Sequence, residues 1–208
     1  MILPASEIAQ RLRRESGPKE DPLVITPMPD LGSLDKSGSG SVDLRLGTWF
    51  VSPRPRTTPF LDIFDEQNDP GYSEEQFTKT SYVPFGERFI LHPGNFILAV
   101  TLEWLRLPAD LAGYVVGKSS WGRRGLIIAT ATGVHPSFTG CLTLELANVG
   151  ELPIAIYPGM GICQIFLHKT AESSPHVDQS SFVGFRRPIL GRLVPDTTSR
   201  LLRTRSPM

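Results

Sequence analysis

The chain has 208 residues, of which 40% are hydrophobic and 20% charged, and its 21 lysine and arginine residues balance its 21 aspartate and glutamate residues. This length fits one domain, and the composition is that of a folded globular protein and not of a disordered chain. A balanced charge provides no broad positive field, so a nucleic-acid polymer is excluded as a partner, and any anion site has to be local.

Targeting and metal-binding signals are missing from the sequence. The N-terminal residues carry too many charges for a signal peptide, and no apolar run approaches the length of a membrane span, so we expect a cytoplasmic protein without membrane contact. Cys141 and Cys163 lie in apolar runs, where buried free thiols are expected. The histidines lack metal-ligand spacing, and we expect no zinc site.

In chain order, the first predicted element is a helix from residue 4 to about residue 15. Ile8 and Leu12 fall on one face of it, and Ser6 is a suitable cap. Residues 17–40 are rich in Pro, Gly, Asp and Ser, and they predict a loop with short extended pieces.

From Ser41 onward, short runs of β-branched and aromatic residues alternate with turn residues. The runs are SVDLRL, TWFVS, RFIL, FILAVTLEWL, GYVVG, LIIATA, CLTLELAN, PIAIY and GICQIFLHK. Strands at this spacing, with no helical pattern between them, predict an antiparallel sandwich or barrel.

These elements predict a single domain over residues 1–195. Residues 53–82 interrupt the strand pattern with polar and acidic residues, which indicates an insertion or a flexible loop. Residues 196–208 have no apolar period and end basic, so we expect a flexible tail, with an anion-contacting arm as the alternative.

The segment GKSSWGRRG, residues 117–125, is the first candidate site. Its glycines let backbone amides approach an anion, and Lys118, Ser119 and Ser120 add a cation and two hydroxyl donors, a combination that suits a polyphosphate. The spacing is not that of a P-loop. A solvated basic turn is an equally good interpretation of this segment taken alone.

Glu145 lies in the run CLTLELAN, where alternation puts Cys141, Thr143, Glu145 and Ala147 on one face and three leucines on the other. If the leucines face the core, the carboxylate faces a cavity or an interface, where it could transfer protons. An exposed carboxylate paired with a basic residue is the plainer alternative.

Two further polar features have structural interpretations. His135, in the connection GVHPSFTG, is a lone imidazole of a kind that is more often structural than catalytic. Asp43 and Arg45 share one face of a strand, and we expect them to form an ion pair with each other.

Three ordered segments resemble the dCTP deaminase and dUTPase superfamily, and specifically its dCTP deaminase branch. They are SVDLRLG, FILHPGNFILAVTLEWLRLPADLAGYVVGKSSWGRRGL and SFTGCLTLELANVGELPIAIYPGMGICQIF. The match runs from about residue 41 to residue 168 and is best over the core 83–170. The resemblance implies a distorted antiparallel β-barrel or jelly-roll of the dUTPase-like type with a short N-terminal helix.

The resemblance also implies a homotrimer with active sites at subunit interfaces, a deoxyribonucleoside triphosphate substrate, and Mg²⁺ held through the nucleotide phosphates. It implies no zinc, in keeping with the absence of the H-x-E and P-C-x-x-C elements of zinc-dependent deaminases.

Carried over to this sequence, the resemblance makes Glu145 the general base and acid, with Ser119 positioning the water and Arg123 steadying charge near the pyrimidine. Lys118, at a position where the family has arginine, and Ser120 would contact phosphate. Thr132 is a further expected substrate-binding residue.

Two departures from the family pattern concern substrate binding. Where the deaminases read Ile-Asp-Pro-Gly, this chain reads Val134 to Ser137, so His135 replaces the sugar-facing aspartate. Where the family has a phosphate-closing lysine and tyrosine, this chain offers Phe182, followed by Arg186 and Arg187, which could replace the lost cation.

The leading hypothesis is a zinc-free deaminase that converts dCTP to dUTP and ammonia. One alternative is release of pyrophosphate from dUTP, alone or after deamination. This reaction is disfavoured because the aspartate that activates water in dUTPases is His135 here. The other alternative is a nucleotide-binding trimer without catalysis.

Overall fold

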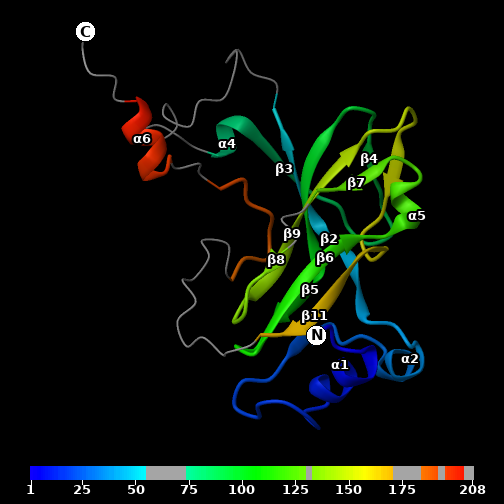
Figure 1. The fold of residues 1–208 in the computed structure, drawn as a ribbon. Coiled ribbons are helices and arrows are strands. Elements are labelled where there is room, and N and C mark those ends of the chain that lie inside the picture. The colour runs from blue at the N-terminus through cyan, green and yellow to red at the C-terminus, as the bar shows by residue number, and fades with distance from the viewer. Residues whose placement is uncertain (55–73, 130–132, 171–183, 192–194, 204–208) are drawn as a thin grey trace.

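The computed structural model describes residues 1–54, 74–129, 133–170, 184–191 and 195–203. Antiparallel strands form the body of the molecule, and helices α1 and α2 pack together at one end of it (Figure 1). The strands are β1 (Val24–Thr26), β2 (Ser41–Pro53), β3 (Thr78–Tyr82), β4 (Phe89–Leu91), β5 (Phe96–Arg106), β6 (Leu111–Gly117), β7 (Leu126–Ile128), β8 (Gly133–Val134), β9 (Thr139–Asn148), β10 (Ile154–Ile156) and β11 (Gly161–Lys169). The helices are α1 (Ala5–Leu12), α2 (Leu31–Lys36), α4 (Glu74–Phe77), α5 (Ser119–Gly122) and α6 (Thr197–Arg203).

Nine strands form one sheet in the order β7-β9-β5-β2-β11-β6-β8, with β1 paired to β5 and β3 paired to β2, while β10 and β4 form a separate pair. Every pair of strands in the described part of the chain is antiparallel. The prediction of a mainly β, antiparallel barrel-like fold is confirmed.

Strand β2 joins the two halves of the large sheet. Its first part pairs with β11, and its second part pairs with β5 and β3. The change of partner requires a close approach at Gly47, where an added Cβ would lie 3.1 Å from the carbonyl oxygens of Val100 and Thr101. A residue larger than glycine would therefore force the backbone to shift at this irregularity in the β2–β5 pairing.

An ion pair with a buried carboxylate lies beside this irregularity. Glu103 of β5 is only 2% exposed, and its carboxylate accepts a 2.8 Å hydrogen bond from the backbone N–H of Arg45 and a 2.6 Å bond from Nε of the same residue. Both oxygens of a carboxylate buried among apolar strands are thus satisfied.

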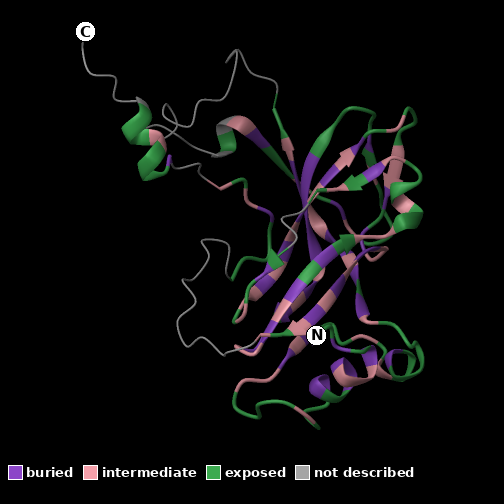
Figure 2. Ribbon diagram, in the orientation of Figure 1, coloured by how far each residue is buried: buried purple, intermediate pink, exposed green. Residues whose placement is uncertain are grey.

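The apolar core lies between the strands, and burial alternates along them (Figure 2). In β9, Leu142, Leu144 and Leu146 are buried, while the residues between them are half-buried. The predicted assignment of the two faces of this strand is confirmed.

The N-terminal region contains more regular structure than predicted. Helix α1 is confirmed, with Ile8 and Leu12 buried, but it begins after Pro4 and takes no side-chain cap from Ser6. The expected loop over residues 17–40 contains β1 and α2. Asp30 caps α2 by accepting hydrogen bonds from the backbone N–H groups of Gly32 and Ser33. The hydrogen bond from the Ser33 hydroxyl lowers the pKa of the Asp30 carboxyl most, and the two backbone bonds lower it further.

Two other predicted irregular regions also contain regular structure. Within the expected insertion 53–82, β2 extends to Pro53 and pairs with β3, so the part of the insertion that stays untested is 55–73, outside the described residues. In the expected tail, helix α6 occupies Thr197–Arg203.

We predict that Glu103→Ala lowers the free energy of unfolding by about 3 kcal/mol. The change leaves the Arg45 backbone N–H without a hydrogen-bond acceptor and removes the buried partner of the ion pair. The value lies at the lower end of the usual range because the Arg45 side chain is 40% exposed and can still reach water. Urea unfolding measures the change. Lys169→Ala, which breaks the more exposed pair with Glu7, is the control and should cost less than about 1 kcal/mol. Equal losses in the two variants would contradict the prediction.

Candidate active site

Helix α5 and its flanking residues form the first part of the site, and three contacts hold them in place. The backbone N–H of Lys118 donates to Ile162 O at 3.1 Å, and the indole Nε1 of Trp121 donates to Gly161 O at 3.1 Å. The Lys118 ammonium forms an ion pair with Asp43, with 2.5 Å between Nζ and Oδ2. The turn is thus fastened to the start of β11 and to β2.

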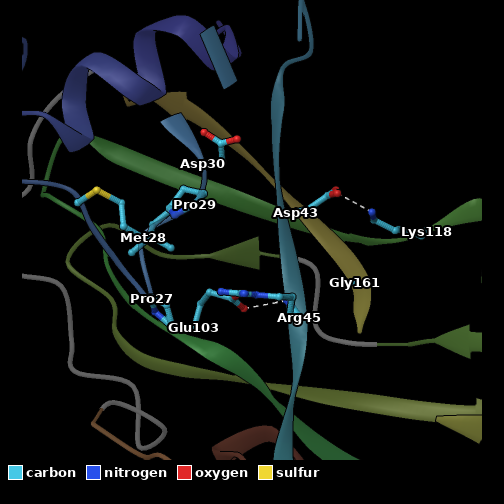
Figure 3. A pocket seen from close by; sticks show the side chains of 10 residues that line it. Pro27, Met28, Pro29, Asp30, Asp43, Arg45, Glu103, Lys118 and Gly161 are labelled. Carbon is cyan, nitrogen blue, oxygen red and sulfur yellow. Dashed lines mark hydrogen bonds and ion pairs between the residues drawn. The ribbon is translucent and has the colours of Figure 1, made fainter. Parts of the chain in front are cut away.

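The predicted ion pair between Asp43 and Arg45 is wrong. Each residue pairs across strands instead, Asp43 with Lys118 and Arg45 with Glu103 (Figure 3). Asp43 also carries a carboxylate, but it is exposed to water, whereas the buried carboxylate of Glu103 lies in low-dielectric surroundings, where its attraction to Arg45 is stronger. The acidic residue inside the apolar run FILAVTLEWL was the signal that could have identified this partner.

A pocket of about 420 Å³ opens beside these two ion pairs (Figure 3). Apolar residues from the segment after β1 form one of its walls, and Asp43, Arg45, Glu103 and Lys118 are among its charged residues. Lys118 therefore lies between this pocket and the exposed hydroxyl-bearing turn.

The remaining predicted residues of this turn point to solvent. Ser119, Ser120 and Arg123 are exposed. Arg124 donates a 2.6 Å hydrogen bond to Ser120 O, which closes the turn on itself. Two hydroxyls and a guanidinium are thereby presented together on a short, well-anchored helix.

Strand β7 separates this turn from Glu145. At the first end of β7, Gly125 packs against Gly150, and just past its other end the backbone N–H of Ala129 donates to Glu145 O at 2.8 Å. The four residue-to-residue steps from Gly125 to Ala129 span about 13 Å in extended conformation. The structure of one chain therefore does not bring Ser119 and Arg123 together with Glu145.

Glu145 lies on a sheet face that is largely covered. In the register of the sheet, Glu145 is opposite Leu98 in β5, which is opposite Val51 in β2, so the three side chains share one face. Leu98 is 6% exposed and Val51 is 3% exposed, whereas Glu145 itself is half-buried. The carboxylate is thus partly shielded from water, which corresponds to the first of the two alternatives that the alternation left open.

His135 follows β8 in an exposed turn, where Phe138 N donates to His135 O. Ser137, which stands where the deaminases have glycine, keeps a left-handed backbone with φ of 63°. The backbone of this turn therefore keeps the conformation expected of a glycine, although the residue here is a serine. Thr132 and Phe182, two other predicted substrate-binding residues, lie outside the described residues.

Arg186 and Arg187 are exposed and form cation–π contacts with tryptophans. The guanidinium of Arg186 lies 5.0 Å from the ring centre of Trp104, and that of Arg187 lies 3.9 Å from the ring centre of Trp49. In the view of Figure 1, their segment lies on the left of the sheets and α5 on the right. Within one chain these arginines are therefore distant from Lys118 and Ser120. Sequence reasoning missed both tryptophans as partners.

The two cysteines are free, with Cys163 buried and Cys141 half-buried. Burial raises the pKa of the Cys163 thiol to about 12, and it also raises the pKa of Cys141. These are the properties of structural thiols that stay protonated at neutral pH. Among the described residues, no three His, Cys, Asp or Glu side chains are grouped so that they could hold a metal ion.

A profile of the dCTP deaminase-like family matches residues 2–170. Because the match covers most of the chain, the chain belongs to the dCTP deaminase-like family and is an enzyme of that family. The resemblance to this family that the sequence motifs predicted is confirmed.

Relatives in three organisms carry the name dCTP deaminase, dUMP-forming. The protein of Acidothermus cellulolyticus is 42% identical over 167 residues, which cover 80% of this chain and 78% of that one. That of Methanobrevibacter smithii is 40% identical over 148 residues, covering 71% and 72%. That of Methanosphaera stadtmanae is 35% identical over 183 residues, covering 85% and 89%.

A solved structure, the 2'-deoxycytidine 5'-triphosphate deaminase from Agrobacterium tumefaciens, matches with a TM-score of 0.56 and 22% identity. The match covers 80% of this chain and 46% of that chain, so this chain spans about half of its length. The similarity supports the fold assignment. No helix in the described part of the chain is long and apolar enough to cross a membrane.

We predict that Gly125→Ala lowers the free energy of unfolding by about 2 kcal/mol, because alanine is strained at a left-handed φ and its Cβ would meet a neighbouring backbone. The φ of Gly125 is 89°, and an added Cβ would lie 2.6 Å from Gly150 N. Gly122→Ala, where an added Cβ meets nothing within 4 Å, is the matched control and should be neutral or stabilising by up to about 1 kcal/mol, because alanine is favoured over glycine in a helix. Urea unfolding of both variants measures the difference, and a neutral Gly125→Ala would contradict it.

Proposed function

We propose that this enzyme deaminates dCTP by hydrolysis without zinc, with Glu145 as the general base and acid. The observation that carries the proposal is the half-buried carboxylate of Glu145 on a covered sheet face, in a chain of the dCTP deaminase-like family. A carboxylate in such surroundings is suited to proton transfer, because bulk water does not screen it fully.

The proposed reaction balances with one water molecule. Glu145 takes a proton from water while the water oxygen bonds to C4 of the cytosine. The C4–N4 bond then breaks, and the amine leaves as ammonia. One water proton ends on the ammonia and the other on N3 of the uracil ring.

In this proposal Ser119 and Arg123 act on the same reaction from a second copy of the chain. Ser119 would position the water, and Arg123 would stabilise the charge that develops as C4 becomes tetrahedral. The separation of α5 from Glu145 along β7 supports a site shared between copies.

An exposed apolar surface is suited to packing between copies. Tyr114 and Val116 of β6 are 49% and 45% exposed, and Phe166 of β11 lies beside Tyr114 in the register. We propose the homotrimer of the resemblance as the assembly, and sedimentation that finds a stable monomer would contradict it.

The nucleotide's phosphates would meet Lys118 and Ser120. We further propose that Mg²⁺ arrives with these phosphates, since the described residues form no carboxylate cage for it and Mg²⁺ usually binds through substrate phosphates. His135 and Thr132 are proposed to contact the sugar and Phe182 to lie near the nucleotide. A neutral imidazole at residue 135 can still hydrogen-bond a hydroxyl.

Two end products of the proposed reaction are supported by different observations. His135, in place of the water-activating aspartate of dUTPases, favours dUTP as the product. The relatives carry the words dUMP-forming in their names, and this wording favours a second step that releases pyrophosphate.

Incubation of pure protein with dCTP and Mg²⁺, followed by nucleotide chromatography and assays of ammonia and pyrophosphate, separates these outcomes. Parallel incubations with CTP, dCMP, dUTP and modified cytosine nucleotides define the substrate. Tight nucleotide binding with no product from any of them would replace the proposal with a non-catalytic binding protein.

We predict that Glu145→Gln lowers kcat for deamination roughly 10²- to 10⁴-fold, because the amide keeps the shape of the side chain but cannot transfer the proton. Its melting temperature should stay close to that of the wild type. Glu151→Gln, in an exposed turn, is the matched control and should leave kcat unchanged. Full activity of Glu145→Gln would exclude Glu145 as the base.

A further inference from the structure

The C-terminal segment, residues 184–191, begins beside the sheet face that carries Glu145. Two backbone hydrogen bonds join it to the start of β9, from Gly184 N to Thr139 O at 2.7 Å and from Cys141 N to Phe185 O at 3.0 Å. Pro188, within the same segment, is buried. These contacts dock the segment against the sheet.

The two tryptophans under Arg186 and Arg187 belong to that same face. Trp104 is opposite Cys141 in β9, and Cys141 shares its face with Glu145. Trp49 lies two residues before Val51, whose side chain is in the same row as Glu145. Successive rows on one face of a strand are about 7 Å apart, so both indoles lie within a nucleotide's length of the carboxylate along the sheet.

A cation–π contact leaves the hydrogen-bonding groups of an arginine available. Each guanidinium carbon lies over an indole ring, and this contact does not use the N–H groups as donors to a protein acceptor. Both arginines are exposed. The indole therefore restricts the orientation of each cation and leaves its donors for an anion with several oxygens.

We propose that Trp49 and Trp104 are positioning residues for a polyphosphate clamp made by Arg187 and Arg186. The proposal rests on the proposed function, because the polyphosphate is that of the nucleotide whose base meets Glu145. Adjacent cations held in fixed directions bind a triphosphate better than a monophosphate, since only the longer chain reaches both. The clamp would give the site a preference for a triphosphate over a monophosphate.

Calorimetric titration with inorganic tripolyphosphate tests the clamp without any turnover. We predict that Trp49→Leu weakens tripolyphosphate binding about fivefold and raises KM for dCTP by a similar factor, because an exposed cation–π contact is lost. The value of kcat, and the binding of inorganic phosphate, should change by less than about twofold, since neither needs both arginines.

Variants with a matched design separate positioning from stability. Trp49→Phe retains an aromatic face and should recover most of the binding, and Tyr157→Leu removes an exposed aromatic residue that carries no stacked arginine in the described contacts. As a single change, Arg187→Gln should weaken tripolyphosphate binding. In the Trp49→Leu variant the same change should weaken it little further, because both changes disable the same cation. Trp104→Leu with Arg186→Gln gives the second such cycle.

Unchanged tripolyphosphate binding in folded Trp49→Leu and Trp104→Leu would overturn the clamp. If Trp49→Leu does not fold, additive effects of Trp104→Leu and Arg186→Gln would overturn it equally. Failure of the proposed function has a different signature, namely a wild-type protein that binds tripolyphosphate but produces no ammonia from any cytosine nucleotide.

Discussion

The architecture depends on the close approach of β2 to β5 at Gly47. An added Cβ there would lie 3.1 Å from two carbonyl oxygens of β5, so a side chain would require the backbone to shift. Next to it the Arg45 backbone and guanidinium satisfy the buried carboxylate of Glu103. A close backbone contact and a buried charge each tolerate little displacement. Together they fix the angle at which the half of the sheet around β11 and β6 meets the half around β5 and β9.

Both parts of the candidate site take their positions from this one strand. On the first part of β2, Asp43 holds the Lys118 ammonium and so one side of the α5 turn. On the second part, Val51 lies in the row of Glu145, and Trp49 carries Arg187. A change in the bend of β2 would thus move the turn and the carboxylate face relative to each other.

The sequence predicted well whatever depends on local periodicity, and less well whatever depends on distant partners. The alternation of CLTLELAN correctly assigned the faces of β9, because a strand next to a core has one dominant hydrophobic pattern. The predicted partner of Arg45 was wrong because local reasoning considers the neighbour on the same strand, whereas the actual partner is a carboxylate 58 positions away in the sequence. Helix α2 was hidden by a composition typical of loops, although Asp30 supplied its cap. The stacked arginines combine segments whose proximity only the tertiary fold creates.

The path of the large sheet ends in two very short strands, β7 with three residues and β8 with two. The last strand of any open sheet presents unpaired backbone groups that can recruit a strand from another molecule. Here the terminal strands β7 and β8 are themselves too short to offer a long ladder of unpaired groups. Backbone pairing between copies at these two strands would therefore be limited to a few hydrogen bonds, and contacts between side chains would have to supply most of any association there.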